Sequence, residues 1–252
     1  MNLEHIKKLF EKSKKRTTKK TKFNSNHYTF VHDSLNLLFG ISESKRKILP
    51  VEKQIAYHNF LVNLVTSVEC FLKNLILSGN FWNEDSYKTL LKDKEKIDLF
   101  QAFELFGNVK VTRQLLITHY YSFQNFNEIN KVFTCLIQGN KEEKTDFVFN
   151  LGKTHFETFS FNKDNFAMEK IATLNEQHPE WKRQLIKMFE IRNEFIHERT
   201  LTRLTLSKVI EYWGMVIDFE NCVDAFFAEQ IMGQMIAEKR RKKKRTIPVV
   251  KM

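Results

Sequence analysis

Residues 55–77 read IAYHNFLVNLVTSVECFLKNLIL. Apolar residues recur in this stretch at intervals of three and four, the spacing that places side chains on one face of an α-helix. They are Leu61, Leu64, Val65, Val68, Leu72, Leu75 and Ile76. Ser78-Gly79-Asn80 follows as a helix stop. The stretch therefore predicts one long core helix.

Other stretches on either side have the same helical period. They are a patch around 27–39 that ends at Gly40, a stretch at 109–137 broken near 121–125, a helix from Pro179 or Glu180 to about Glu198, and a long last helix at about 202–239. Residues 139–165 lack this period and alternate Phe with polar residues, so we expect either a short hairpin or an ordered loop.

Composition favours the same fold class. Only seven Gly and three Pro occur in 252 residues, too few for the turns of a sandwich or a Rossmann fold. We therefore predict an all-α helical bundle with four core helices, an extra N-terminal helix and an insertion at about 139–165. The expected domain spans 27–237, between a basic N-terminal arm at 1–26 and a basic C-terminal tail at 238–252.

The formal net charge of +11 is concentrated at the two ends of the chain. Residues 1–22 hold nine Lys and Arg against two Glu, and residues 238–252 hold eight against one, which leaves 24 basic and 27 acidic residues between them. The C-terminal run comprises Lys239, Arg240, Arg241, Lys242, Lys243, Lys244 and Arg245. Such runs attract phosphate backbones without regard to sequence, so this tail is a candidate nucleic-acid-binding segment; a solvated solubility tail is the plainer interpretation.

The cysteines and the apolar segments predict a cytoplasmic protein without a membrane span. Cys70, Cys135 and Cys222 lie far apart in apolar segments and lack metal-ligand spacing, so we expect buried thiols. We identify no secretion signal, and no apolar run approaches the ~20 residues of a transmembrane helix.

A charged side chain in the third long helix indicates a functional site. On an ideal helix, Trp181, Leu185, Met188, Phe189, Phe195 and Ile196 share one face, and Arg192 lies near its centre. A buried guanidinium needs a carboxylate, a cleft or a second subunit. Glu69, in the apolar stripe of residues 55–77, is a candidate partner for Arg192 or an orienting residue; alternatively it lies at the edge of that stripe. His197 lies about 140° from Arg192 on the wheel, so the two converge only if Arg192 extends or the helix loosens near Glu198.

The sequence Arg192-Asn193-Glu194-Phe195-Ile196-His197 resembles the motif of HEPN nucleases, an Arg followed by a polar residue, three more residues and a His. In that family the motif lies towards the end of the third bundle helix and precedes a long fourth one, as it does here. The segment from Ser67 to Lys73 looks like part of the family's first long helix with its frequent acidic residue. The resemblance covers about 55–77 and 109–236.

The resemblance implies a metal-independent RNA endonuclease without a cofactor. His197 would act as general base or general acid, because a histidine titrates near neutral pH. Arg192 would hold the scissile phosphate, and Asn193 would orient His197 or the phosphate. Two protomers would join two such pairs at a two-fold axis, attack by the RNA 2′-hydroxyl would leave a 2′,3′-cyclic phosphate, and DNA would resist cleavage.

The biological role that this implies is a toxin or antiphage-defence effector, with an antitoxin or another regulatory partner as a candidate. Related toxins have a Tyr two residues after the motif His, where this chain has Arg199, so regulation by adenylylation of that Tyr is unsupported. The alternative is a non-catalytic HEPN-like module that binds RNA or protein. A plain structural interpretation also exists, in which Arg192 is salt-bridged and His197 is favoured by the helix dipole.

Overall fold

The computed structural model describes residues 49–78, 84–91, 113–138, 146–161 and 167–245, and the single positions 33, 36, 38 and 40. These residues are mostly helical, and the sheet they contain is a two-stranded hairpin, which confirms the predicted all-α class. The predicted N-terminal arm and residues 246–252 lie outside the described residues. So does most of the helix predicted at 27–39, although its four described positions are helical.

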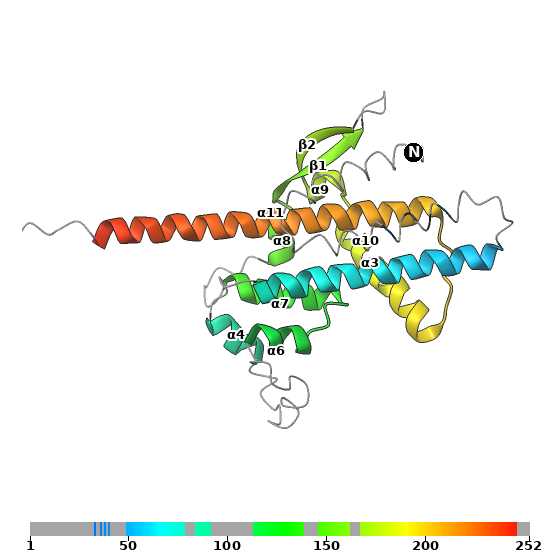
Figure 1. Ribbon diagram of the computed structural model, residues 1–252, viewed down its shortest axis with the longest axis horizontal. Helices are drawn as coiled ribbons and strands as arrows, with labels where there is room; N and C mark the ends of the chain where they lie inside the picture. Colours follow the sequence, from blue (N-terminus) through cyan, green and yellow to red (C-terminus); the bar gives the residue numbers. More distant parts are fainter. Residues whose placement is uncertain are drawn as a thin grey trace, which may run out of the picture.

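Two long helices lie side by side through the molecule, α3 (Pro50–Ser78) and α11 (Leu206–Arg245) (Figure 1). They run in the same direction. Gln54, near the start of α3, contacts Leu204, just before α11 begins, and further along both helices the Ser67 hydroxyl donates to the Glu220 carboxylate at 3.4 Å. Helix α10 (Trp181–Asn193) packs against both of them.

Helix α3 confirms the predicted core helix and extends it by one turn at the N-terminus. Pro50 occupies the first turn, where its missing N–H costs nothing, and Glu52 accepts a hydrogen bond from the Leu49 N–H at 2.8 Å. By length and composition α3 could cross a membrane, so the expectation that no segment approaches a span is wrong. This is weak evidence for a span, because half of its most apolar stretch is buried inside the fold, as in a core helix.

The described part of the stretch at 109–137 forms two helices with a break where the sequence predicts it. Helix α6 (Arg113–Tyr120) and helix α7 (Phe126–Gln138) are joined by residues 121–125, and α4 (Glu84–Leu91) packs against both. Phe123 lies in the link with φ 57°, in the left-handed region. Its side chain is fully buried, so burial of the ring holds a backbone conformation that Phe rarely adopts.

The predicted insertion contains a short helix and the first strand of a hairpin, and a hairpin was one of its two expected forms. Helix α8 (Phe147–Leu151) is capped by the Asp146 carboxylate, and strands β1 (His155–Phe161) and β2 (Ala167–Thr173) pair antiparallel. Helix α9 (Leu174–Gln177) follows, with a capping box between its N-cap Thr and Glu. The second strand therefore lies entirely after the predicted end of the insertion at 165.

A buried polar network fastens the hairpin to the bundle. Thr158 of β1 donates to one carboxylate oxygen of Asp218 on α11 at 2.9 Å, and the ring Nε2 of His178 lies 2.8 Å from the other oxygen. Because Thr158 and Asp218 are buried, these bonds fix the position of β1 on α11.

The three cysteines are free thiols in three different environments. Cys222 is buried, Cys135 is half-buried and Cys70 is exposed, so the expectation of buried thiols is wrong for Cys70. Burial is the main reason that the pKa of Cys222 rises to about 12. Periodicity places Cys70 beside the apolar stripe of α3, and the structure leaves it on the outer side of that helix.

Candidate functional site

The motif 192–197 spans a change in helix type. Helix α10 ends at Asn193 and continues directly into η2 (Glu194–Glu198), a π-helical turn. The Arg199 N–H donates to the Glu194 carbonyl five residues earlier, and Arg199 itself has φ 54°, which ends the helix. A π-turn is rare and is frequently found at functional sites.

The π-turn changes which side chains of this helix are buried. The first part follows the predicted stripe, with Trp181, Leu185, Met188 and Phe189 all buried. Phe195 is only half-buried and Ile196 is 41% exposed, so their predicted burial is wrong. The prediction assumed about 100° per residue, and the wider turn from Glu194 onward has a different angle.

Arg192 is half-buried and has few partners for its size. Its Nη1 donates to the Asn193 side-chain oxygen at 2.9 Å, while its Nε is buried and unpaired among the described residues. No carboxylate in the described ranges forms an ion pair with it. A guanidinium carries five N–H donors, and the described residues provide one partner, the side-chain oxygen of Asn193.

His197 is exposed on η2 and has no hydrogen-bond partner among the residues that the structure describes. Its relation to Arg192 depends on the π-turn. Bonds from residue i to i+5 bring residues five apart closer to one face than an α-helix does. The helix is therefore wider from Glu194 onward, which is the change that Arg192 and His197 need in order to approach the same face.

The N-terminal half of α3 supports this site, through two residues that the sequence did not single out. The Gln54 side chain donates to the Leu204 carbonyl at 2.7 Å and accepts from the Leu204 N–H at 2.8 Å, so it clamps the loop that follows η2. One turn later, His58 packs its ring on Phe195 with centroids 4.9 Å apart. Thr202 in the same loop donates to Glu194 at 3.0 Å.

His58 also carries a second unpaired polar atom of this site. Its Nδ1 lies 2.7 Å from the Gln54 carbonyl, which can only accept, so Nδ1 carries the proton. Nε2 is then a buried acceptor with no partner in the described part of the chain. The N-terminal half of α3 and the last turn of α10 thus contain an unpaired acceptor on His58 and an unpaired donor on Arg192.

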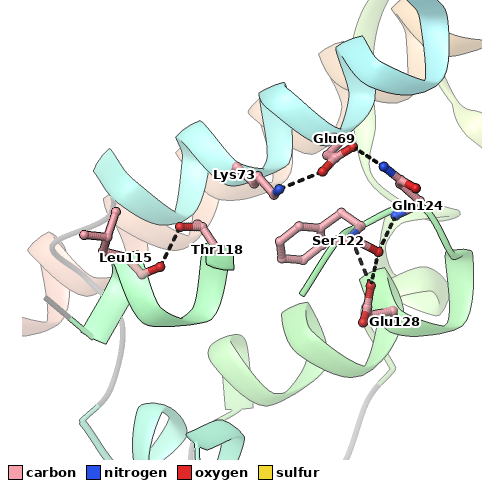
Figure 2. Close-up of polar contacts among 8 residues, drawn as sticks. Glu69, Lys73, Leu115, Thr118, Ser122, Gln124 and Glu128 are labelled. Atoms are coloured by element: carbon pink, nitrogen blue, oxygen red, sulfur yellow. Dashed lines mark hydrogen bonds and ion pairs between the residues drawn. The ribbon is translucent and has the colours of Figure 1, made fainter. Parts of the chain in front are cut away.

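Glu69 belongs to a different cluster, which corrects the proposal that it pairs with Arg192. One carboxylate oxygen contacts the Lys73 ammonium at 2.6 Å, and the other accepts from the Gln124 amide at 2.8 Å (Figure 2). Gln124 lies in the link between α6 and α7, where Glu128 accepts from the Phe123 N–H at 3.0 Å. We call Glu69, Lys73 and Gln124 the Glu69 cluster; it fastens this link to α3.

Glu69 and the motif are also far apart along α3. Phe195 of the motif packs on His58, and eleven residues separate His58 from Glu69, which is about 16 Å along a helix. Helical periodicity places Glu69 beside a buried stripe, but it contains no information on which neighbouring element supplies the partner.

The remaining candidates divide between core and surface. The aromatic residues around the link between α6 and α7 are mostly core, since Tyr121, Phe123 and Phe126 are buried. Among the described residues, no group of three or more His, Cys, Asp and Glu side chains is placed to hold a metal ion.

Helix α11 continues to Arg245, so the run from Lys239 to Arg245 is the end of a helix, although the sequence places the domain boundary before it.

Comparison of the chain with protein-family models, with curated proteins and with solved structures gives no match in any of the three.

Proposed function

We propose that the chain is a metal-independent RNA endonuclease of the HEPN type. The observation that carries this proposal is the half-buried Arg192 guanidinium, which has an unpaired Nε and is held by Asn193 beside a π-turn that carries the exposed imidazole of His197. A phosphate would meet the unused donors of Arg192, and an exposed imidazole can exchange protons with a bound substrate.

The reaction requires only groups that these residues supply. The imidazole of His197 takes the proton of the RNA 2′-hydroxyl, whose oxygen attacks the adjacent phosphorus. The bond to the 5′-oxygen breaks, and that oxygen takes a proton from a protonated imidazole. The products are a 2′,3′-cyclic phosphate and a 5′-hydroxyl, and Arg192 stabilises the additional negative charge of the transition state.

A second protomer would supply the second imidazole, so we propose a homodimer. Apolar exposure supports a contact surface near the motif. Nine large apolar side chains are exposed in the described ranges, and five belong to the segments that meet here, around the start of α3 and the end of η2. These five are Leu49, Val51, Ile55, Ile196 and Leu201.

The proposed setting is the cytoplasm, where such an enzyme would act as a toxin or antiphage-defence effector under the control of a partner. The competing function is an RNA- or protein-binding module without catalysis. It is favoured by the lack, among the described residues, of a hydrogen-bond partner that would orient the exposed imidazole of His197. The two functions differ in whether RNA is cut.

The test is incubation of the purified protein with tRNA and total RNA in EDTA, beside His197→Ala and Arg192→Ala. We expect cleavage by the wild type alone, with 2′,3′-cyclic phosphate ends and no cleavage of DNA. If all three folded proteins gave the same background level of RNA cleavage, the nuclease proposal would be wrong and the binding module would remain.

A further inference from the structure

We propose that the basic end of α11, Lys239–Arg245, is a rigid arm that binds RNA phosphates at a fixed distance from the motif. The inference rests on the proposed nuclease and names its substrate class, which is a folded RNA large enough to contact both sites. A short single strand bound at the motif would not reach the arm.

The arm is the continuation of a core helix. α11 is one helix from Leu206 to Arg245, and its side chains are buried in the bundle from Val209 to Phe227. In Figure 1 its far end, drawn in red, extends past the other labelled elements. Packing of the first half therefore sets the direction of the second half.

The distance between the two sites follows from helix geometry. Residues 198–205 connect the motif to α11, and the Gln54 clamp holds this connection at Leu204. Lys239 comes 33 residues after Leu206, which at 1.5 Å per residue is about 50 Å. The two sites are thus at opposite ends of one helix.

The charge of the arm suits a nucleic acid better than a membrane. Seven consecutive basic residues make up nearly two helical turns, and a run without an apolar residue has no apolar face to enter a bilayer. Glu238 is the single acidic residue from 231 to 245. Like charges one turn apart repel one another, and a phosphate backbone relieves that repulsion.

Binding is measured with His197→Ala, so that the result does not depend on cleavage. Replacing all seven basic residues with Gln should weaken tRNA binding by about tenfold or more and reduce the slope of log affinity against log salt by about 3 to 5. The charge-conserving control is Arg240→Lys, Arg241→Lys and Arg245→Lys, which should retain affinity within about twofold on the same principle. An unchanged slope of log affinity against log salt in the Gln variant would contradict the proposal that Lys239–Arg245 binds RNA phosphates.

Rigidity is tested by inserting Gly-Ser-Gly-Ser after Gly233, which keeps every charge but interrupts the helix. A rigid arm predicts weaker tRNA binding and a raised KM for tRNA cleavage, because a flexible link lowers the effective concentration of the second site. The affinity for a six-nucleotide RNA should not change. If the insertion leaves tRNA binding and KM unaltered, the run is a flexible tail and the fixed distance is wrong.

The competing partner is an anionic lipid surface. Vesicles of phosphatidylserine and of phosphatidylcholine are added to the wild type and to the Gln variant, and binding is measured by co-sedimentation. If the arm binds phosphatidylserine vesicles but contributes nothing to tRNA binding, the RNA assignment is overturned. If the wild type cleaves no RNA while the arm still binds tRNA, the nuclease fails and the RNA-binding arm stands.

Discussion

The Glu69 cluster and the Arg192 motif are both polar groups beside the core, but they differ in how fully their polar atoms are used. Both carboxylate oxygens of Glu69 have partners, a Lys73 ammonium and a Gln124 amide. Arg192 has one bond, to its neighbour Asn193, and a buried Nε that is unpaired among the described residues. A satisfied cluster stabilises a fold, whereas an unsatisfied one has hydrogen-bonding capacity for a ligand.

The largest expected effect is on cell growth. If the Arg192 motif is the catalytic site, bacterial expression of the wild type should reduce colony counts by orders of magnitude, and His197→Ala should restore them. The exposed His197 contributes little to packing, so the variant should accumulate as a folded protein, which western blotting and circular dichroism verify. Toxicity that survives in a well-expressed His197→Ala variant would contradict the assignment.

Glu69→Ala should lower stability and spare the chemistry. It removes a charged acceptor from Lys73 and Gln124, at a cost of about 2 kcal/mol. In a chain of this size that corresponds to about 4–8 °C in Tm. Thermal unfolding checks the first part and RNA cleavage below Tm checks the second. Loss of cleavage in a folded Glu69→Ala variant would return Glu69 to the site.

These two clusters also separate what the sequence predicts from what it cannot. Period and stop signals predict α3, the break at 121–125 and the site of α10, because these features are local. The clamp between Gln54 and Leu204 joins residues 150 positions apart, so no periodicity indicates it. The motif string identifies Arg192 and His197, but helical periodicity does not predict the π-turn that begins at Glu194 and includes His197.

The end of α11 is a second feature that the sequence did not predict. Low apolar content predicts a tail after 237, yet the helix continues to Arg245. Lys and Arg are good helix formers, and positive charge is favourable at a helix C-terminus. A helix that is already nucleated in the core therefore extends through residues that could not form one alone.

A smaller effect is expected from His58→Phe. The phenyl ring keeps the packing on Phe195. It removes the buried unpaired Nε2 but also the Nδ1 bond to the Gln54 carbonyl, so the two changes offset in part and Tm should change by no more than a few degrees, about 1 kcal/mol. Differential scanning calorimetry gives the value. A loss of stability several times larger would mean that Nε2 has a hydrogen-bond partner. His58, like Glu69, would then be a polar group whose bonds stabilise the fold.

The smallest effect concerns thiol chemistry. At pH 8 an alkylating reagent should modify the exposed Cys70 first and leave Cys222 unmodified until the protein unfolds, since burial both shields Cys222 and raises its pKa to about 12. Mass spectrometry of peptides over time follows the order. Early modification of Cys222 in folded protein would show that the packing of α11 against α8 opens readily.

The most direct test compares the two clusters in one assay, the rate of cleavage of a single defined RNA in EDTA by Arg192→Ala and by Glu69→Gln, each at a temperature where it is folded. We expect Arg192→Ala to slow cleavage by about 100-fold or more, because it removes the group that stabilises the transition-state charge. Glu69→Gln should remain close to the wild-type rate. Equal rates for the two variants, or a greater loss in Glu69→Gln, would contradict the claim that the unsatisfied cluster performs the chemistry.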